Sequence, residues 1–364
     1  MVEKINVAIV FGGRSTEHKI SLLSAKNVIR SLDKSKYKPV LICIDKSGKW
    51  FYNEDSLHLL SSESASTVHL DHQHTPVILS QNADAKALII ATTHQVIHTI
   101  DVIFPVLHGT SGEDGSIQGL AKLANLPCVG CGILGSAVGM DKDIMKRVLR
   151  DSQIPVADFV TVRNTNFEEY PYDKVSEKLG KDLFLKPANL GSSVGVSFVH
   201  NKEEYDAGIQ HALLYDHKVV VEEKIVGREL ECSVLGNDSP MASIPGEVVP
   251  KGGFYSYQNK YLDEKGAELI IPAALSEEKI KEIQELSIRT FQLIECEGMT
   301  RVDMFMQEDG KLVINEVNTI PGFTSISMYP KLLEYSGVNN VELVTKLIEY
   351  AIESHEKRNQ LKIE

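Results

Sequence analysis

Two alternating segments on either side of Asp309 and Gly310 predict a β-hairpin with one charged face. An Asp-Gly pair between alternating runs is a strong signal for a two-residue hairpin turn. If 309 and 310 form that turn, Asp303 lies opposite Glu316 and Arg301 lies opposite Asn318, all on one side of the ribbon. The other side then carries the apolar residues, among them Val302, Met304 and Met306.

The two opposed carboxylates of this hairpin admit two interpretations. Directly opposed side chains have Cβ atoms about 5 Å apart, and like charges in that position repel. A solvated charged face has to accept this repulsion, whereas a divalent cation between Asp303 and Glu316 removes it. Oxygen ligands from Asp303, Glu316 and Asn318 suit Mg²⁺ held jointly with substrate phosphates, and Arg301 beside them would stabilise developing negative charge. We favour the metal site.

The length and charge of the chain limit what such a site could bind. A chain of 364 residues predicts two or three domains, and 43% hydrophobic and 24% charged residues are typical of a globular protein. Disordered and collagen-like chains are excluded, and no apolar run approaches the ~18 residues of a membrane span. The formal charge of −12 argues against general nucleic-acid binding. A bound nucleotide therefore requires a few cations or metal ions that reverse the field locally.

Strands alternate with helical stretches through the first third of the chain. Strand-like runs at 7–11, 40–44 and 100–107, with a helix at about 17–32, predict a parallel α/β domain over about 1–131. Further along, Ser276 is the predicted N-cap of a long helix. No element or site is assigned to 52–98.

The cysteines and the first residues bear on the cell compartment. Five scattered cysteines are typical of reduced thiols. Cys128 and Cys131 form a CxxC without partner ligands at zinc-finger spacing, so packing in an apolar turn is favoured over redox or metal chemistry. The chain enters its first strand without a basic segment and a long apolar core, so no signal peptide is predicted. Together these features predict a cytoplasmic protein.

A glycine turn, Gly12 and Gly13, follows the first strand. The G-x-G-x-x-G spacing is absent and Arg14 stands where a backbone should approach pyrophosphate, so an NAD-linked oxidoreductase is disfavoured. A glycine-rich turn at the carboxyl end of a strand is still a typical ligand-binding edge. Glu17, just beyond it, is either an acidic residue of the first helical turn or a carboxylate for a substrate cation. The loop 108–115, which begins with His108, is either a plain loop or borders the same strand-edge crevice.

Two further segments have the composition of movable ligand-binding loops. Lys186 ends a strand and precedes a Gly/Ser stretch at 191–195, which lacks the G-K-[ST] of a Walker A loop. That stretch is either an exposed hairpin or a flap that folds over phosphates. The segment 251–266, with Lys260 and Tyr261 at its centre, is either a surface loop or a lid that closes over charged ligands.

Two longer patterns resemble those of the D-alanine–D-alanine ligases of the ATP-grasp superfamily. The first runs from His108 through Gly-Glu-Asp-Gly to Gly119, and the second runs from Gly298 through Arg301-x-Asp303 and Glu316-x-Asn318 to Gly322. The resemblance implies an α/β fold (α+β overall) with a three-domain ATP-grasp architecture. The implied units are an N-terminal parallel α/β substrate-side domain at 1–131, a central ATP-grasp subdomain with the Gly/Ser flap at 132–222, and a C-terminal ATP-grasp subdomain with the metal hairpin and lid at 223–364.

The resemblance also implies a two-step reaction between ATP and two molecules of D-alanine. ATP phosphorylates the carboxylate of the first, giving an acyl phosphate and ADP. The amine of the second attacks, and a tetrahedral intermediate collapses to D-alanyl-D-alanine and phosphate, for peptidoglycan precursor synthesis. A carboxylate is a poor electrophile, so activation by phosphate is required. The acyl phosphate has to be kept from water, which explains a lid and a flap.

Each matching residue acquires an implied role. For the metal, Asp303, Glu316 and Asn318 would hold two Mg²⁺ ions, with Mn²⁺ as an alternative. For ATP, the implied residues are the phosphate-contacting Lys142 and Lys186, the adenine-side Glu222, Glu223, Lys224 and Ile225, and the ribose ligand Glu229. For the amino acids, they are Glu17 with its linked Ser192 and Tyr261, His108 in the substrate crevice, Arg301 and the Gly322 N–H at the oxyanion, Ser327 and Met328 at the second carboxylate, and Lys260 at the transferred phosphate.

One departure and several alternatives accompany the resemblance. Position 224 is lysine where some relatives carry an aromatic residue near adenine, which affects only how the adenine is packed. A D-alanine–D-lactate or D-alanine–D-serine ligase is the nearest alternative, although Tyr261 within Asn-Lys-Tyr favours D-alanine. A non-catalytic ATP-binding regulatory protein is more remote, because the full set of charged site residues is present. The family also implies a homodimer, and no nucleic-acid or membrane partner is expected.

Overall fold

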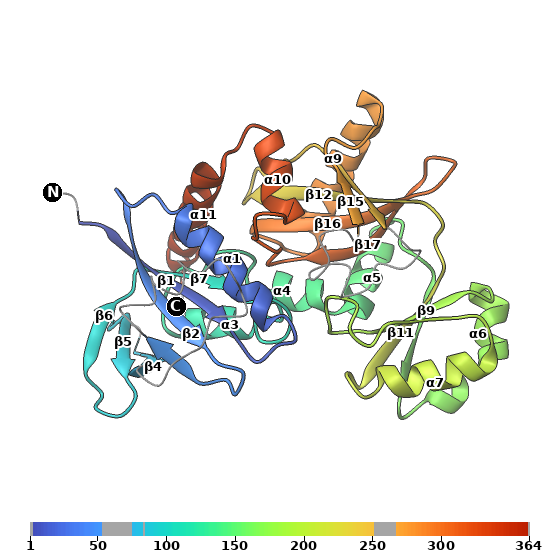
Figure 1. Ribbon diagram of the computed structural model, residues 1–364, viewed down its shortest axis with the longest axis horizontal. Coiled ribbons are helices and arrows are strands. Elements are labelled where there is room, and N and C mark those ends of the chain that lie inside the picture. The colour runs from blue at the N-terminus through green and yellow to red at the C-terminus, as the bar shows by residue number, and fades with distance from the viewer. Residues whose placement is uncertain (1–2, 53–74, 83, 251–266, 363–364) are drawn as a thin grey trace.

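The computed structural model describes residues 3–52, 75–82, 84–250 and 267–362, whose strands form three sheets spread along the long axis of the molecule (Figure 1). In the first sheet β1 (Ile5–Gly12) runs parallel to β2 (Tyr37–Ile44) and to β7 (Val102–Val106). The sheet continues beyond β2 with four antiparallel strands, β3 (Trp50–Tyr52), β4 (Thr75–Leu79), β5 (Ala87–Ile90) and β6 (Val96–Thr99). The predicted parallel arrangement is therefore confirmed for three strands. The antiparallel extension lies mostly within 52–98, the region that received no assignment.

Alternate residues of β1 face two different helical layers. Val7 and Ile9 pack in one cluster with the apolar faces of α1 (His18–Arg30) and α11 (Asn340–Asn359). Ala8 and Val10 face the other way, toward α3 (Ser116–Leu123). Both faces of the sheet are thus covered, as a parallel sheet requires. The last helix of the chain supplies core to the first sheet, although it lies beyond residue 223 in the sequence.

The second sheet is antiparallel and forms the end of the molecule opposite the first. Its strands are β8 (Phe159–Arg163), β9 (Leu183–Pro187), β10 (Ser197–Val199) and β11 (Lys218–Glu223), in the order β10-β9-β11-β8, so β8 is an edge strand. One face is covered by α6 (Tyr172–Leu179) and α7 (Lys202–Ala212), whose fully buried Tyr205 packs in the same cluster as Val219. A single turn of 3₁₀ helix, η2 (Phe167–Glu169), leads into α6.

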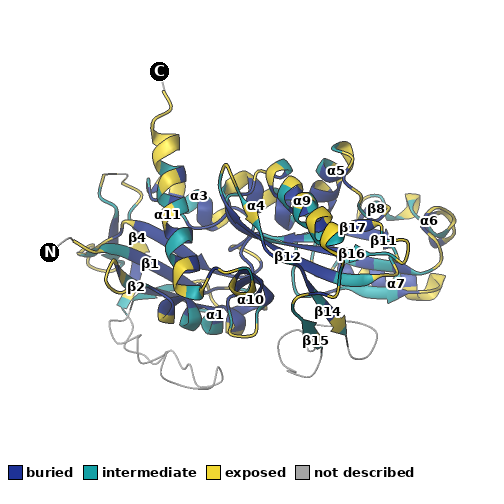
Figure 2. Ribbon diagram, turned by 90° about the horizontal axis from the view of Figure 1, so that it is seen from above, coloured by how far each residue is buried: buried dark blue, intermediate teal, exposed yellow. Residues whose placement is uncertain are grey.

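The third sheet lies between the other two and carries the predicted hairpin (Figure 1). Its strands are β12 (Arg228–Gly236), β13 (Met241–Ala242), β14 (Gly246–Pro250), β15 (Ala267–Ile270), β16 (Gly298–Met306) and β17 (Leu312–Asn318). Its main core lies against α5 (Lys142–Asp151) and α9 (Glu277–Leu293), and α4 (Ile133–Met140) precedes α5. A smaller cluster joins it to α10 (Met328–Tyr335). The central strands of the first and third sheets are almost wholly buried, and the exposed residues gather on the outer helix faces (Figure 2).

Several local predictions can be compared directly with the structure. Ser276 is the N-cap of α9, and its side chain accepts a hydrogen bond from the N–H of Lys279. All five cysteines are free thiols. Cys131 is buried in the core of the third sheet, as packing requires. Within the described part of the chain, no helix has both the length and the apolar character needed to cross a membrane.

Candidate active site

The predicted hairpin is formed by β16 and β17, and its pairing is confirmed where the charged residues lie. Asp303 is opposite Glu316, and Arg301 is opposite Asn318. The predicted two-residue turn is wrong. Gln307 and Lys311 close a three-residue loop of 308–310, with Gly310 at a φ of +85°. A longer turn shifts the pairing by one residue, but a β-bulge between Asp303 and Met304 shifts it back.

The bulge brings an additional side chain into the site. Asp303 pairs with Glu316 and Met304 with Ile314, so Asn315 is the extra residue. Its Oδ1 accepts a hydrogen bond of 3.1 Å from Nζ of Lys186, which belongs to the second sheet. Simple alternation places Asn315 on the apolar side of the ribbon, and for that reason sequence reasoning missed it. Bulges are typical of strand positions that redirect a side chain next to a functional site.

The guanidinium of Arg301 is held in one plane by two buried carboxylates. Its Nε and Nη2 donate to the two oxygens of Asp303, each at 2.7 Å. Nε also lies 2.9 Å from Oε2 of Glu231, which stands opposite Asp303 on β12. Asn318 donates to Oδ2 of Asp303 at 3.0 Å. Two parallel N–H···O bonds fix geometry as well as charge. Glu231 was not predicted, because only the pairing of β12 with β16 brings it to the hairpin.

The predicted repulsion between Asp303 and Glu316 is offset by side-chain cations in the structure. Arg301 neutralises Asp303, and Nζ of Lys142 lies 3.7 Å from Oε2 of Glu316. Among the described residues no group of three or more His, Cys, Asp or Glu side chains is placed to hold a metal ion. A metal at the hairpin would therefore use two carboxylates and the amide oxygen of Asn318. Oxygen donors of this kind fit Mg²⁺, which completes its coordination with water and substrate phosphates.

Lys186 belongs to a buried chain of charges between the second sheet and α5. Its Nζ lies 2.7 Å from one oxygen of Glu222, and Nζ of the fully buried Lys146 lies 3.2 Å from the other. Burial alone raises the pKa of Glu222, but the two ammonium groups hold it below its ordinary value. Burial lowers the pKa of Lys146. Since Glu222 is fixed by both lysines, this chain positions the ammonium of Lys186 beside the hairpin.

The predicted adenine residues lie at the end of β11 (Glu222 and Glu223) or directly after it (Lys224 and Ile225), and the predicted ribose residue, Glu229, lies on β12. Glu223 accepts a hydrogen bond of 2.7 Å from the N–H of Asp158. Lys224 is exposed and lies 3.4 Å from Asp182, with its Nζ over the ring of Phe198. The segment therefore connects the second and third sheets, and it includes Ile225 and Glu229, both half-buried.

Glu17 lies buried between two loops that are far apart in the sequence. The hydroxyl of Ser192 in the Gly/Ser loop donates to Oε1 of Glu17. A Cβ on Gly109 would lie 2.9 Å from Oε2 of Glu17, and a Cβ on Gly191 would lie 3.2 Å from it. Gly109 also has a φ of +74°, which L side chains rarely adopt. The structure thus brings the glycine turn, the loop at 108–115 and the Gly/Ser loop together around one carboxylate.

His108 lies next to the Glu17 carboxylate, and hydrogen bonds within the protein hold its ring in place. Its Nδ1 and Nε2 each make a 3.0 Å hydrogen bond, to the carbonyl of Ile320 and to the hydroxyl of Ser24. Burial lowers its pKa, so the ring is neutral at pH 7. A cavity of about 280 Å³ opens at the same place, lined by both His108 and the Gly12–Gly13 turn, as the predicted crevice requires.

Glu113 is a second buried carboxyl in this region, and sequence reasoning gave it no role. Its two oxygens accept hydrogen bonds from the backbone N–H groups of Gly109 at 3.0 Å and Ile320 at 3.2 Å. Burial, and then the charge of Glu17, raise the pKa of Glu113 to about 8. Glu113 therefore ties the loop at 108–115 to the segment after β17. The sequence feature that could have identified Glu113 is its position within the Gly-Glu-Asp-Gly motif.

Glu113→Gln should make folding stability less sensitive to rising pH. The folded-state pKa of about 8 lies above the ordinary 4.5, so the native protein holds an extra proton between these values. The associated stability is fully present below about pH 4.5 and is lost as the pH rises through 8, at up to about 1.4 kcal/mol per pH unit. Urea unfolding at pH 5, 6.5 and 8 measures this slope.

The glutamine NH₂ cannot accept the hydrogen bond that one carboxylate oxygen accepts, so the substitution also changes the absolute stability. The readout for this variant is therefore the slope of the free energy of unfolding against pH. We expect a shallower fall in the free energy of unfolding for Glu113→Gln than for the wild type. Exposed Glu177→Gln serves as the control and should keep the wild-type slope. Equal slopes for all three proteins would contradict the assignment of the proton to Glu113.

The predicted pocket for a second amino acid lies where α10 begins. Ser327 is the N-cap of α10, and its hydroxyl accepts a 3.0 Å hydrogen bond from the N–H of Thr324. Met328 is buried with Val248 and Leu332, so its side chain belongs to the core. A Cβ on Gly322 would lie 2.9 Å from the Ser327 hydroxyl oxygen. The unpaired N–H groups of a helix start suit a carboxylate.

Lys260 and Tyr261, with the rest of the predicted lid, lie outside the described residues. The described part of the site thus contains the hairpin, the Lys186–Glu222 chain, the Glu17 loops and the start of α10.

Two family models match this chain. The family model for the D-ala D-ala ligase N-terminus matches residues 6–131, and the model for the D-ala D-ala ligase C-terminus matches residues 148–349. The chain is 48% identical to a D-alanine–D-alanine ligase of Oceanobacillus iheyensis over 359 residues, which are 99% of this chain and 98% of that protein. It is 47% identical to D-alanine–D-alanine ligase A of Escherichia coli over 361 residues, 99% of each chain.

Solved structures show the same relationship. The D-alanine–D-alanine ligase of Coxiella burnetii matches with a TM-score of 0.88 and 38% identity, over 99% of this chain and 97% of that one. The VanG D-Ala:D-Ser ligase of Enterococcus faecalis matches with a TM-score of 0.86 and 37% identity, over 96% of this chain and all of that one. The matches in sequence and the matches in structure both cover nearly the whole length of this chain. The chain belongs to the D-alanine–D-alanine ligase family.

Proposed function

We propose that this chain is an ATP-dependent ligase that joins two D-alanines into D-alanyl-D-alanine through a D-alanyl phosphate, for peptidoglycan precursor synthesis. The observation that carries the proposal is the charged hairpin face, where Arg301, Asp303 and Glu316 meet Lys142 and Lys186 from two other parts of the chain. A phosphorylated substrate needs positive groups at its binding site. In this otherwise acidic protein, the hairpin face supplies them. Family membership supports the same reaction.

ATP and Mg²⁺ fit the residues of this face. Asp303, Glu316 and Asn318 would hold the metal, which neutralises phosphate charge when bound. Lys142 and Lys186 would contact the phosphates; their ammonium groups already lie against oxygen acceptors, Leu190 O for Lys142 at 2.7 Å and Glu222 for Lys186 at 2.7 Å. Glu222, Glu223, Lys224 and Ile225 would border the adenine, and Glu229 would bind the ribose.

The first step makes the carboxyl group of one D-alanine electrophilic. One of its oxygens attacks the terminal phosphorus of ATP, the bond to the bridging oxygen breaks, and ADP leaves with that electron pair. Charge then develops on the phosphoryl oxygens and, in the second step, on the tetrahedral oxyanion. Arg301 stabilises this charge because its plane is fixed in advance by Asp303 and Glu231. The Gly322 N–H is the second proposed oxyanion donor.

The site has to recognise the ammonium group of the first D-alanine and the carboxylate group of the second. Glu17 accepts the ammonium of the first D-alanine, and Ser192 links this carboxylate to the Gly/Ser loop. His108 orders the wall of the adjoining crevice through Ser24 and Ile320. Ser327 and the backbone of Met328, at the start of α10, bind the carboxylate of the second D-alanine. Tyr261 and Lys260 of the proposed lid would complete the site.

Gly109→Ala is expected to lower D-alanine-dependent phosphate release at least tenfold, about 1.4 kcal/mol. The added methyl would lie 2.9 Å from Oε2 of Glu17, and the φ of +74° disfavours any side chain. Glu17 then has to move away from the ammonium it binds, so the KM for the first D-alanine rises. Steady-state phosphate release over a range of D-alanine concentrations measures both parameters.

Gly119→Ala is the matched control for this variant. Gly119 lies in α3, and a Cβ there would meet nothing within 4 Å. Alanine at this position should leave activity unchanged and slightly raise stability. A Gly109→Ala protein with wild-type kinetics would contradict the placement of substrate next to Glu17.

The proposal also covers the domain organisation, the oligomeric state and the cellular location. We keep the units 1–131, 132–222 and 223–364, with α11 returning to cover the first sheet. The family supports a homodimer, which sedimentation velocity tests directly. Reduced cysteines throughout the chain support a cytoplasmic location.

The proposed function is tested by incubating the protein with ATP, Mg²⁺ and D-alanine and measuring phosphate and dipeptide. Phosphate release at the alanine-free rate would contradict it, and L-alanine should not substitute. The second candidate is a D-alanine–D-serine ligase, because a ligase of that type is among the structures that match. Competition between D-alanine, D-serine and D-lactate at neutral pH separates the alternatives, and we expect D-alanyl-D-alanine as the main product. An ATP-binding protein without turnover would give no product with any of them.

A further inference from the structure

We propose that a basic cavity between α5 and α6 binds a small anion that carries two phosphate groups. The cavity measures about 380 Å³, within the range of pockets that bind small molecules. None of the residues predicted for ATP, metal or amino acid lines it. The inference does not depend on the proposed function.

Two cations come from α5, on one side of the cavity. Arg147 and Arg150 are three residues apart and share one face of that helix. Nε of Arg147 lies 2.6 Å from Asp143, and its Nη2 reaches the hydroxyl of Thr161 on β8. Arg150 has no ion pair with a carboxylate among the described residues, and its guanidinium lies over the ring of Phe159, 5.4 Å from the ring centre.

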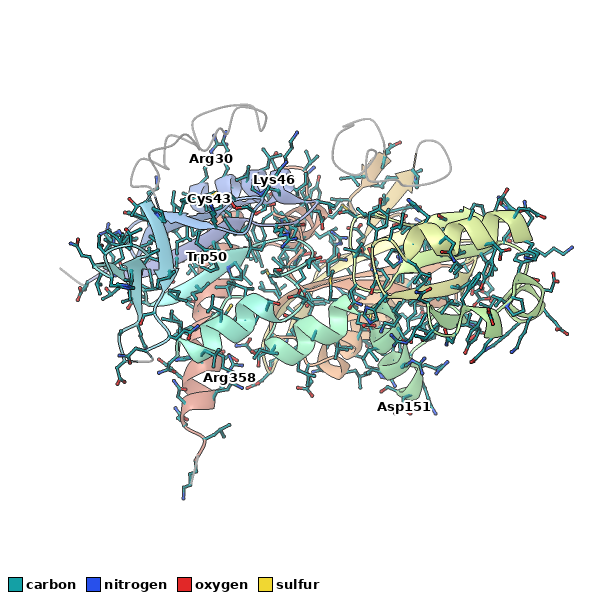
Figure 3. All side chains as sticks on the ribbon, turned by 90° about the horizontal axis from the view of Figure 1, so that it is seen from below. Arg30, Cys43, Lys46, Trp50, Asp151 and Arg358 are labelled. Atoms are coloured by element: carbon teal, nitrogen blue, oxygen red, sulfur yellow. The ribbon has the colours of Figure 1, made fainter. Side chains whose placement is uncertain are left out.

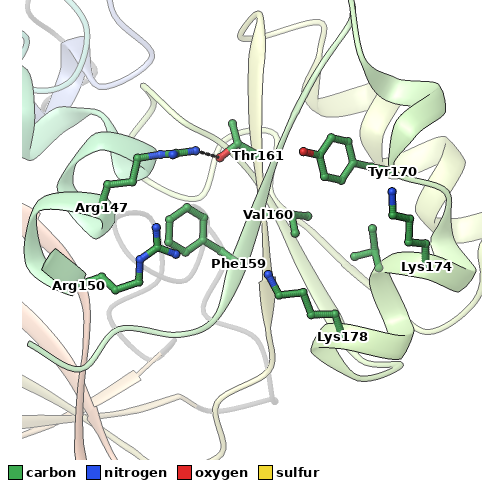
Figure 4. Close-up of a pocket in the computed structure, with 9 residues that line it drawn as sticks. Arg147, Arg150, Phe159, Val160, Thr161, Tyr170, Lys174 and Lys178 are labelled. Atoms are coloured by element: carbon green, nitrogen blue, oxygen red, sulfur yellow. Dashed lines mark hydrogen bonds between the residues drawn. The ribbon is translucent and has the colours of Figure 1, made fainter. Parts of the chain in front are cut away.

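Two more cations come from α6, on the other side. Lys174 and Lys178 are four residues apart, so they too share a helix face. Lys174 donates to the carbonyl of Glu169 at 3.0 Å and lies over the ring of Tyr170. The structure places no carboxylate against Lys178 within the part of the chain it describes. The edge strand β8 runs between the two helices, and Lys178 extends toward it (Figure 4).

The charge around this cavity is opposite to that of the chain as a whole. Four cationic side chains line it in a protein with a formal charge of −12, and no carboxylate is among the lining residues. Among the described residues, the carboxylate in contact with them is that of Asp143, which is buried and also lies 3.2 Å from Lys218. Unneutralised cations gathered around one cavity repel each other, and an anion relieves that repulsion. The cavity therefore favours an anionic ligand.

The arrangement of the cations indicates the class of anion. Arginine guanidinium groups bind phosphate through planar N–H pairs, and lysines bind it as point charges. One pair of cations lies on each helix, so the two pairs can engage two phosphate groups of one molecule. The hydroxyls of Thr161 and Tyr170 add neutral partners, and the ring of Phe159 adds an apolar wall. Organic diphosphates and bisphosphates have this combination of charge and size.

Titration calorimetry with inorganic pyrophosphate in metal-free buffer at low salt tests the proposal. The key variant is Arg150→Gln with Lys178→Gln, two exposed positions at which folding should be unaffected. The matched control is Arg30→Gln with Lys38→Gln, which removes the same charge from two exposed positions of the first domain. Arg30 lies far from Asp151, the last residue of α5 (Figure 3).

We expect the wild type and the Arg30/Lys38 control to bind pyrophosphate with equal affinity, and the Arg150/Lys178 variant to lose that binding at least tenfold. The KM for ATP of the Arg150/Lys178 variant should stay at the wild-type value, which separates this cavity from the ATP site. Absence of binding to the wild type would overturn the proposal. Equal affinity in the Arg150/Lys178 variant would also overturn it, because pyrophosphate would then occupy another site.

Discussion

Asp303→Asn is expected to lower D-alanine-dependent phosphate release about 10³-fold, or about 4 kcal/mol of transition-state stabilisation. Asparagine preserves the size of the side chain but removes the charge that would recruit the metal. It also removes one of the two Asp303 oxygens that accept hydrogen bonds from Nε and Nη2 of Arg301, each at 2.7 Å. Metal neutralisation and arginine orientation are thus weakened together. Steady-state rates at saturating ATP and D-alanine, with Mg²⁺ varied, measure the loss.

The matched control lies in the same hairpin. Asp309 is exposed in the turn, and its Oδ1 accepts a hydrogen bond of 2.9 Å from the N–H of Lys311. Asparagine keeps that oxygen, so Asp309→Asn should have wild-type activity. If Asp303→Asn keeps a rate within threefold of the wild type, the hairpin is not the metal site, and a regulatory ATP-binding role becomes the better account.

Arg301→Lys is expected to lower kcat about 10²-fold to 10³-fold, while the KM for ATP changes little. Lysine keeps the positive charge, so the electrostatic neutralisation of Asp303 and Glu231 is largely preserved. It cannot reproduce the two parallel N–H···O bonds that fix the plane of the guanidinium. The rate therefore falls because the oxyanion donor is no longer oriented. The split between kcat and KM is the readout that a merely structural role would not produce.

Arg228→Lys provides the control for a lost bidentate pair. Arg228 lies on β12 of the same sheet and bonds both oxygens of Glu247, at 2.8 and 2.6 Å. Lysine there should lower stability by about 1 kcal/mol and leave kcat unchanged. Similar kcat values for Arg301→Lys and the wild type would remove Arg301 from the reaction.

The hairpin shows how far sequence reasoning reaches. The pairing of Asp303 with Glu316 was predicted from an Asp-Gly turn and strict alternation, and the structure has that pairing. Both assumptions were incomplete, since the turn has three residues and the strand has a bulge, and the two errors cancel at the charged end. Turn chemistry and alternation are local signals, whereas a bulge is not encoded in hydrophobic periodicity.

Other features depend on contacts that no local pattern reveals. Glu231 reaches Arg301 only because β12 pairs with β16, 70 residues further along. Lys146 was missed because a lysine in a helix is usually exposed, whereas here Glu222 on another element compensates its burial. The roles of Glu17 and Ser192 were inferred by resemblance, and the structure adds their contact. The sequence predicts the element types well; long-range pairing decides which side chains meet.

In the proposed reaction the carboxyl group of D-alanine is activated by phosphoryl transfer from ATP. This activation can be tested with D-alanine carrying ¹⁸O in both carboxyl oxygens, incubated with ATP and Mg²⁺. Attack of that carboxylate on phosphorus, followed by amine attack on carbon, leaves one carboxyl oxygen on the released phosphate. We expect one ¹⁸O atom in each phosphate formed with dipeptide, measured by mass spectrometry. Phosphate that contains no ¹⁸O, with label in AMP or in neither product, would contradict it.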